Sequence, residues 1–240
     1  PMSTGRYHGE RLGACTDCRR FWAQFRAGKV SDREITEIEG NLATTQGVMT
    51  QIKRDIQRYA PVNLMTVPHM IDAADYLGSL NLAEEKKHTG GGPSYEASYI
   101  IGGQIQGNKP SVHLVYPQGN HITTSTHTHY LQIGESKYGK PILDRIVSPE
   151  LSLETAALCA LVSMDSTMRS NLMVGPPIDL MIYQADSLMP GRQYNYDLDS
   201  AYLRELKKSW DHNLKEAFNR LPPVSWSANW DSKSGENGKS

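Results

Sequence analysis

The sequence predicts an α+β protein, a four-layer αββα sandwich in which helix pairs cover both faces of stacked antiparallel sheets. One observation is that helical periodicity follows Gly40 and gives way to strand-like patterning after residue 94. Another is that helical patterns return near residue 140 and again before the C-terminus. The order is therefore helices, strands, helices, strand and helix, which lacks the regular strand–helix alternation of a parallel doubly wound fold.

Local patterns predict the individual elements. Val48, Ile52 and Ile56 recur near helical spacing, and Pro61 ends the helix that they predict. Gly107-Asn108-Lys109-Pro110 is typical of a hairpin turn. We expect helices over residues 43–59, 67–80, 140–147, 153–171 and 200–220, and extended segments over residues 94–106, 111–116, 120–133 and 178–184.

The domain organisation follows from length and from where the patterns begin. A chain of 240 residues can bury one sizeable core, so a single domain is expected. Residues 1–39 form an atypical N-terminal segment in which Thr4–Glu10 does not have the pattern of a strand. Residues 40–226 form the body, and the Ser-rich residues 227–240 are expected to be a disordered tail.

Composition excludes several classes of function. Lys and Arg number 25 against 26 Asp and Glu, so no basic excess indicates a nucleic-acid partner. No apolar stretch is long enough to span a membrane, and the N-terminus has no apolar signal region. Three cysteines fit a reducing compartment, so we expect a cytoplasmic protein without a membrane partner. No cofactor is expected.

A metal site is an alternative that the residues leave open. Cys15 and Cys18 have the spacing of half a zinc site or a redox pair. His127 and His129 would face the same side if they lay on a strand, and could then supply two further ligands. Since there is no second cysteine pair and Cys159 is expected inside a helix, a metal-binding module is the weakest alternative.

Four segments of the body carry a resemblance to a known family. They are residues 40–46 (GNLATTQ), 99–106 (YIIGGQIQ), 132–145 (QIGESKYGKPILDR) and 160–182 (ALVSMDSTMRSNLMVGPPIDLMI). In this order and spacing they resemble the Anbu (ancestral beta subunit) family of bacterial proteasome-type β subunits. The resemblance implies an N-terminal-nucleophile hydrolase fold, a peptide or amide substrate and assembly into a ring or open spiral. It leaves open an ATPase or activator partner.

Hydrolases of this type attack an amide carbonyl with the hydroxyl of an N-terminal Thr, whose own α-amine is the base. Thr4 is the Thr nearest to the start of the sequence and is our candidate nucleophile, and Ser3 is the nearest Ser. The resemblance implies Asp17 as the carboxylate that orients a lysine, with Arg19 beside it. Lys29 would be the ammonium that lowers the pKa of the nucleophile. Pro1 has no nucleophilic side chain, so Thr4 requires processing, and we keep the hypothesis that residues 1–39 are not the family's native N-terminus.

Supporting residues are implied further along the chain. Glu135 and Ser136 follow the strand end where the family places a Ser that supports the amine. Glu135 could handle protons there or simply form an ion pair with Lys137 or Lys140. Ser170 and Asn171 fall where related subunits have an Asp that contacts the catalytic Thr, while Met173 replaces an expected Ser.

The C-terminal helix carries an apolar stripe at near (i, i+4) spacing, which most simply faces the core. The stripe consists of Tyr202, Leu206, Trp210, Leu214 and Phe218. In a ring-forming family, part of it would instead face a neighbouring subunit.

The leading interpretation is a proteasome-like, threonine-type hydrolase of peptide or amide bonds that self-assembles. One alternative is a catalytically inactive structural subunit of the same fold. The other is an N-terminal-nucleophile amidohydrolase that acts on small amides.

Overall fold

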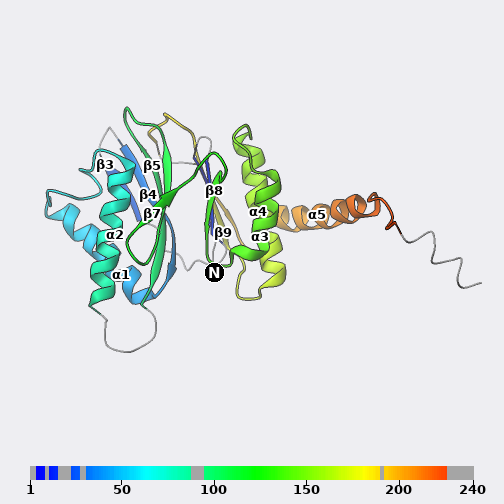
Figure 1. Cartoon of the computed structure of the whole chain (residues 1–240), viewed down its shortest axis with the longest axis horizontal. Helices are drawn as coiled ribbons and strands as arrows, with labels where there is room; N and C mark the ends of the chain where they lie inside the picture. The colour runs from blue at the N-terminus through cyan, green and yellow to red at the C-terminus, as the bar shows by residue number, and fades with distance from the viewer. Residues whose placement is uncertain are drawn as a thin grey trace, which may run out of the picture. The chain divides into compact units, whose positions relative to one another are not determined.

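The computed structural model describes residues 4–8, 11–15, 23–27, 31–87, 95–189 and 192–225, and before Gly40 it describes the backbone alone. In these residues it confirms the predicted α+β class (Figure 1). The chain divides into two compact units, residues 1–200 and residues 201–240, and each is described by itself.

The strands are β1 (Thr4–His8), β2 (Arg11–Cys15), β3 (Ala23–Ala27), β4 (Ser31–Gly40), β5 (Ala97–Ile105), β6 (Ser111–Val115), β7 (His121–Thr123), β8 (Tyr130–Ile133), β9 (Ile178–Tyr183) and β10 (Arg192–Tyr196). The helices are α1 (Leu42–Gln57), α2 (Met70–Lys86), α3 (Ser136–Ile146), α4 (Leu153–Ser170) and α5 (Ala201–Asn219).

Within the described residues the strands form two five-stranded sheets. Sheet A has the order β10-β9-β1-β2-β8, and sheet B has the order β3-β4-β5-β6-β7. Sheet B is antiparallel throughout. Sheet A is mixed, because β9 runs parallel to β1 and β8 runs parallel to β2. The all-antiparallel expectation is therefore wrong for sheet A.

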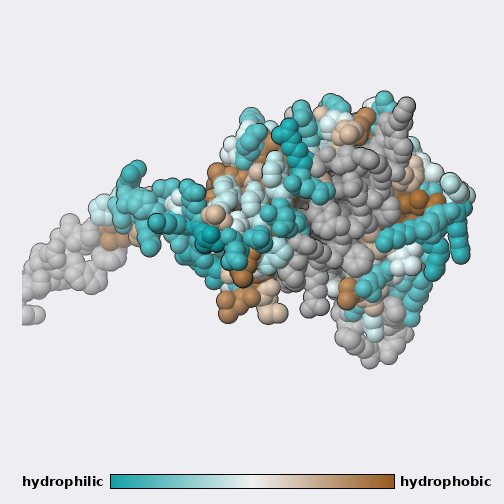
Figure 2. Space-filling view, turned by 180° about the vertical axis from the view of Figure 1, so that it is seen from behind, coloured by the Kyte–Doolittle hydropathy of each residue, from teal (hydrophilic) through white to brown (hydrophobic). Residues whose placement is uncertain are grey.

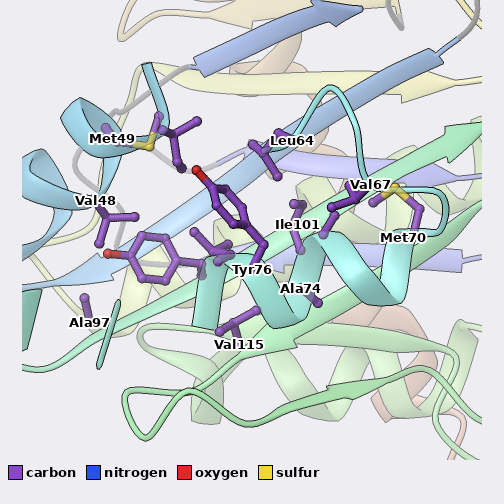
Figure 3. Packing of buried hydrophobic residues seen from close by; sticks show 14 of the residues in the cluster. Val48, Met49, Leu64, Val67, Met70, Ala74, Tyr76, Ala97, Ile101 and Val115 are labelled. Carbon is purple, nitrogen blue, oxygen red and sulfur yellow. The ribbon is translucent and has the colours of Figure 1, made fainter. Parts of the chain in front are cut away.

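Helices α1 and α2 cover one face of sheet B (Figures 1 and 3). Side chains from both helices, including Val48, Ile52 and Leu77, pack with Tyr99 and Ile101 of β5 in one buried cluster. Burial of this kind contributes roughly 1.5–3 kcal/mol for each large apolar side chain. The cluster therefore fixes this helix pair on the sheet.

A glycine and a cap residue turn the chain from β4 into α1. Gly40 has φ 119°, and a Cβ at this position would lie 2.2 Å from the carbonyl oxygen of Glu96, so only glycine fits. Asn41 then caps α1, since its side chain accepts from the backbone N–H groups of Ala43 and Thr44. The Gly-Asn pair of the first family-like segment is explained by this turn.

The other face of sheet B packs against sheet A. Ile100 of β5 and Leu114 of β6 lie in one buried cluster with Leu131 and Ile133 of β8. Farther along, the Tyr183 hydroxyl of β9 donates to Oε1 of Gln104 on β5 at 2.9 Å. Both contacts join the inner faces of the two sheets.

Helices α3 and α4 pack closely on each other and lie beside sheet A (Figure 1). They approach each other closely at Gly139 of α3, where a Cβ would lie 2.1 Å from Oγ of Ser163 on α4. The N-terminus of α4 is capped as expected, because Oγ of Ser152 accepts from the backbone N–H of Thr155 at 3.1 Å.

The structure corrects several expectations from the sequence. Residues Thr4–His8 form β1, although their sequence does not have a strand pattern. Helix α2 begins at Met70 after the N-cap His69, so Pro68 lies before the helix and not in its first turn. The polar strand β10 was not anticipated. No described helix is long and apolar enough to cross a membrane.

The second unit contains α5, and its apolar stripe is not in a core. No residue of α5 is buried in the chain by itself. Leu214 is 52% exposed and Phe218 is 69% exposed, so the core-facing expectation is wrong. Figure 2, which shows one face of the molecule, has hydrophobic residues at several separate places and not in one continuous patch.

A Gly139→Ala substitution tests the close approach of α3 and α4. The added methyl group would meet Ser163, so we expect the free energy of unfolding to fall by about 1–3 kcal/mol. The measurement is chemical denaturation followed by circular dichroism. Gly175→Ala is the control, since nothing lies within 4 Å of a Cβ there. A loss as large for Gly175→Ala as for Gly139→Ala would contradict the explanation.

The thiol of Cys159 provides a second test of packing. Burial inside α4 raises the pKa of Cys159 to about 11. At pH 8 the thiolate fraction is therefore only about 0.1%. We expect mass spectrometry to find Cys159 unmodified after iodoacetamide treatment of the folded protein, and modified after treatment in denaturant. Equal modification in both states would show that α4 does not bury this residue.

Candidate functional site

Four strand ends meet at one end of sheet A, which we call the site end. Gly5 pairs with Ala14, so the start of β1 lies beside the end of β2. Cys15 pairs with Ile133, which brings the end of β8 to the same place. The register of β1 with β9 pairs Thr4 with Asp179, which adds the start of β9. Loops that leave these strands therefore converge at the site end.

Glu135 lies in the short loop between β8 and α3. Gly134 before it has φ 77°, and Glu135 is the N-cap residue of α3. Its Oε2 accepts a hydrogen bond from Nδ2 of Asn171 at 3.1 Å. Nζ of Lys137 lies 3.7 Å from the same oxygen, so of the two alternative ion-pair partners of Glu135 the structure shows Lys137. A half-buried carboxylate is thus held at the site end.

Asn171 connects this carboxylate to the segment that enters β9. It is the C-cap residue of α4, and its backbone N–H donates to the carbonyl oxygen of Thr167. Its Oδ1 accepts from the backbone N–H of Met173 at 2.9 Å. One side-chain amide therefore fixes both Glu135 and the chain after α4.

The remaining supporting residues have less specific surroundings. Ser136 is half-buried as the first residue of α3, and its N–H donates to the carbonyl oxygen of Gly134 at 2.8 Å. Ser170 is the exposed last residue of α4. The structure therefore brings Glu135 and Asn171 into direct contact, and gives Ser136 and Ser170 positions adjacent to them in the chain.

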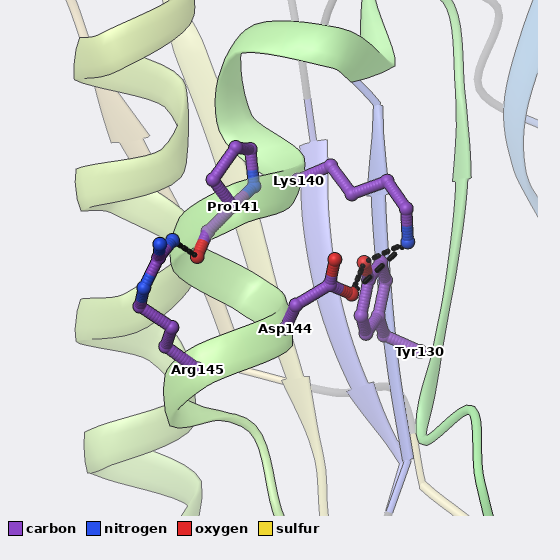
Figure 4. Close-up of polar contacts among 5 residues, drawn as sticks. All are labelled: Tyr130, Lys140, Pro141, Asp144 and Arg145. Atoms are coloured by element: carbon purple, nitrogen blue, oxygen red, sulfur yellow. Dashed lines mark hydrogen bonds and ion pairs between the residues drawn. The ribbon is translucent and has the colours of Figure 1, made fainter.

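A polar cluster joins β8 to α3 behind this loop (Figure 4). The Tyr130 hydroxyl donates to Oδ1 of Asp144 at 2.5 Å and accepts from Nζ of Lys140 at 2.9 Å. Burial and the bond to Asp144 raise the pKa of Tyr130, while hydrogen bonds from Tyr130 and Lys140 lower the pKa of Asp144. The phenol stays protonated, so the cluster fixes the loop that carries Glu135 and does not supply a base.

Asp179 is a site-end residue that the sequence analysis missed. It is 8% exposed, and its Oδ1 accepts from Nδ2 of Asn195 on β10 at 2.5 Å. The only signal in the sequence is one carboxylate inside the apolar run Ile178–Tyr183. The pairing of Asp179 with Thr4 joins two strands that are far apart in the sequence, so the residues around Asp179 do not predict it.

Of the four candidate residues in the N-terminal segment, the structure describes only one. Thr4 is the first residue of β1, where only its backbone is described. Asp17, Arg19 and Lys29 lie outside the described residues. Their assignments remain expectations from the family resemblance.

The structure argues against the reasoning that led to a metal site. His127 and His129 lie in the loop between β7 and β8, so the same-face argument for a strand does not apply to them. Within the part of the chain that the structure describes, no group of three or more His, Cys, Asp or Glu residues is placed to hold a metal ion.

Comparison with solved structures identifies relatives over most of the chain. Anbu (ancestral beta-subunit) from Yersinia bercovieri is 37% identical, with a TM-score of 0.80 over 87% of this chain and 93% of that chain. The helical assembly of the Anbu complex from Pseudomonas aeruginosa is 36% identical, with a TM-score of 0.81 over 91% and 90%. An Anbu (Gly-1) mutant from Hyphomicrobium sp. strain MC1 is 36% identical, with a TM-score of 0.79 over 85% and 86%.

No protein-family model and no curated protein matches the chain. The structural relatives nevertheless exceed 30% identity over most of both chains. The chain belongs to the Anbu (ancestral beta-subunit) family of proteasome-type β subunits.

Proposed function

We propose that this chain is a threonine-type hydrolase of peptide or amide bonds in which Thr4 is the nucleophile. The observation that carries the proposal is the convergence of four strand ends at the site end, with Thr4 at the start of β1. Cleavage of the bond before Thr4 would make its backbone nitrogen a free α-amine. Hydroxyl and amine would then belong to one residue, which is what this chemistry requires.

The surrounding groups have the chemistry that such a site needs. The Glu135 carboxylate, held by Asn171 and Lys137, is a proton-handling group beside the amine. Asp17, Arg19 and Lys29 keep the roles that the family resemblance implies. Ser136 and Ser170 are the supporting hydroxyl groups.

We further propose the four-layer N-terminal-nucleophile sandwich as the fold. Three features support it: the cluster between sheet B and helices α1 and α2, the cluster between the two sheets, and the packing of α3 and α4 beside sheet A. The substrate is a peptide or amide, and an ATPase or activator is a partner to be sought.

Self-assembly into a ring or a helical spiral is the second part of the proposal. One relative is described as a helical assembly of the Anbu complex. In this chain, α5 has no buried residue and leaves Leu214 and Phe218, which are four residues apart on one side of the helix, exposed. Burial of this stripe against a neighbouring copy would stabilise the assembly by about 25 cal/mol per Å² of apolar surface.

A covalent label tests the nucleophile. The chain is prepared with Thr4 as its free N-terminus and incubated with a peptide epoxyketone, which reacts with both the hydroxyl and the amine of an N-terminal Thr. We expect mass spectrometry to find one adduct per chain, located on Thr4.

Two controls accompany the label. Thr4→Ala removes the nucleophile, and the chain that retains residues 1–3 has no free Thr amine, so neither should react. A folded, assembled protein with a free Thr4 and no adduct would reject the hydrolase and favour the inactive structural subunit. Turnover of small amides without cleavage of peptides would favour the amidohydrolase.

A charge in the stripe of α5 tests assembly. Phe218→Asp places a carboxylate on the apolar face, so we expect a fall in particle mass measured by size-exclusion chromatography with light scattering. His212→Asp lies on the opposite side of the helix and should leave the mass unchanged. Equal masses for the wild type and Phe218→Asp would show that this face does not join subunits.

A further inference from the structure

One carboxylate lies at the edge of the core cluster between sheet B and helices α1 and α2. Glu84 of α2 is only 7% exposed, and glutamate is almost never buried without polar partners. Nζ of Lys87, a largely exposed side chain, pairs with its Oε1. The other oxygen, Oε2, lies against α1, because a Cβ at Gly47 would be 2.5 Å from it. Gly47 therefore leaves room for this carboxylate beneath α1.

A phenol in the same cluster has no protein partner for its hydroxyl group. Tyr99 of β5 is fully buried, and its hydroxyl oxygen makes no hydrogen bond to any part of the chain that the structure describes. Tyr76, the other tyrosine of the cluster, instead donates to Oδ2 of Asp55 at 2.7 Å. A buried hydroxyl without a hydrogen bond is costly, and most such groups in folded proteins are satisfied by protein or by ordered water.

The packing of α2 on β5 brings the phenol and the carboxylate into one region. Nδ2 of Asn81 on α2 donates to the carbonyl oxygen of Ala97 on β5 at 2.9 Å. Glu84 is three residues after Asn81, on the same side of the helix, and Tyr99 is two residues after Ala97, on the same face of the strand. Burial, and then the negative charge of Glu84, raise the pKa of Tyr99, so the phenol stays a neutral donor.

We propose that a single water molecule is bound between Tyr99 and Glu84, where it accepts from the phenol and donates to Oε2 of the carboxylate. A water molecule supplies the acceptor that the phenol lacks and a donor that suits the carboxylate. Its second hydrogen is available to Oδ1 of Asn81, one turn earlier on α2, which is buried and also without a partner among the described residues.

The charges around the site favour water over a cation. Lys87 already compensates the carboxylate of Glu84, so a neutral ligand is sufficient. The exposed side chain of Lys87 also shows that solvent reaches the outer side of this carboxylate, and water can enter there. Once bound, the water links β5 to α2 beneath α1, so that three elements of the cluster share one polar contact.

A crystal structure of the protein tests the site directly. We expect a peak of electron density about 2.8 Å from both the Tyr99 hydroxyl and the Glu84 carboxylate, and no peak at that place in Tyr99→Phe. A wild-type map that shows ordered water elsewhere inside the protein and none here would overturn the proposal. Density that contacts only one of the two side chains would overturn it as well.

Tyr99→Phe also changes stability in a direction that depends on the water. If the water is bound, the variant loses a hydrogen bond, and the unfolding equilibrium constant rises about fivefold. If the hydroxyl had no partner, its removal would leave that constant unchanged or lower it. The measurement is chemical denaturation at one protein concentration, because assembly shifts the apparent stability.

Tyr76→Phe is the matched control. It makes the same change in the same cluster, at a phenol whose hydrogen bond to Asp55 is direct, and should raise the unfolding constant by a similar factor. A rise for Tyr76→Phe without a rise for Tyr99→Phe would contradict the water site. If Tyr99→Phe does not fold, the wild-type electron density decides. The inference does not depend on the proposed hydrolase, so the two can fail separately.

Discussion

The parallel pairing of β1 with β9 is the constraint on which the candidate site depends. These strands are separated in the sequence by most of the body, so their pairing is a long-range contact. A slip of one residue would turn every side chain of the strand to the other face. The register is reinforced from the other edge of β9, where Asn195 pairs with Asp179 and donates to its carboxylate. The position of Thr4 is thus set by backbone pairing.

The helices beside sheet A hold the loops that complete the site end. Close packing at Gly139 and Ser163 fixes α3 against α4, so the N-cap of one helix and the C-cap of the other have defined positions. Tyr130 then ties β8 to α3 through Lys140 and Asp144. Both ends of the loop that carries Glu135 are fixed in this way. The hydrogen bond between Glu135 and Asn171 therefore costs little conformational entropy, because no flexible segment has to be ordered to form it.

The sequence predicts those features whose cause is local. Helix α4 follows from apolar spacing and from the Ser152 cap, both read within one turn. Strand β10 was missed because it is polar and largely exposed, so no alternation marks it. At the site, the resemblance indicated Glu135 and Asn171, but their bond spans 36 residues and only the fold creates it. Asp179 was missed because its meaning depends on its register with Thr4.

The apolar side chains that are exposed in a single chain are either isolated or adjacent to one another. Isolated ones are normal on protein surfaces and need no partner. Leu172 and Met173 are adjacent, 97% and 79% exposed, and the Met173 N–H is held by Asn171. This hydrogen bond anchors the backbone of the pair, which lowers the entropic cost of any contact that the two side chains make. The Asn171 side chain also donates a hydrogen bond to Glu135. A contact made by Leu172 and Met173 would therefore act on the residue that orients the carboxylate of the site. In this fold, Asn171 links the outer surface to the site end.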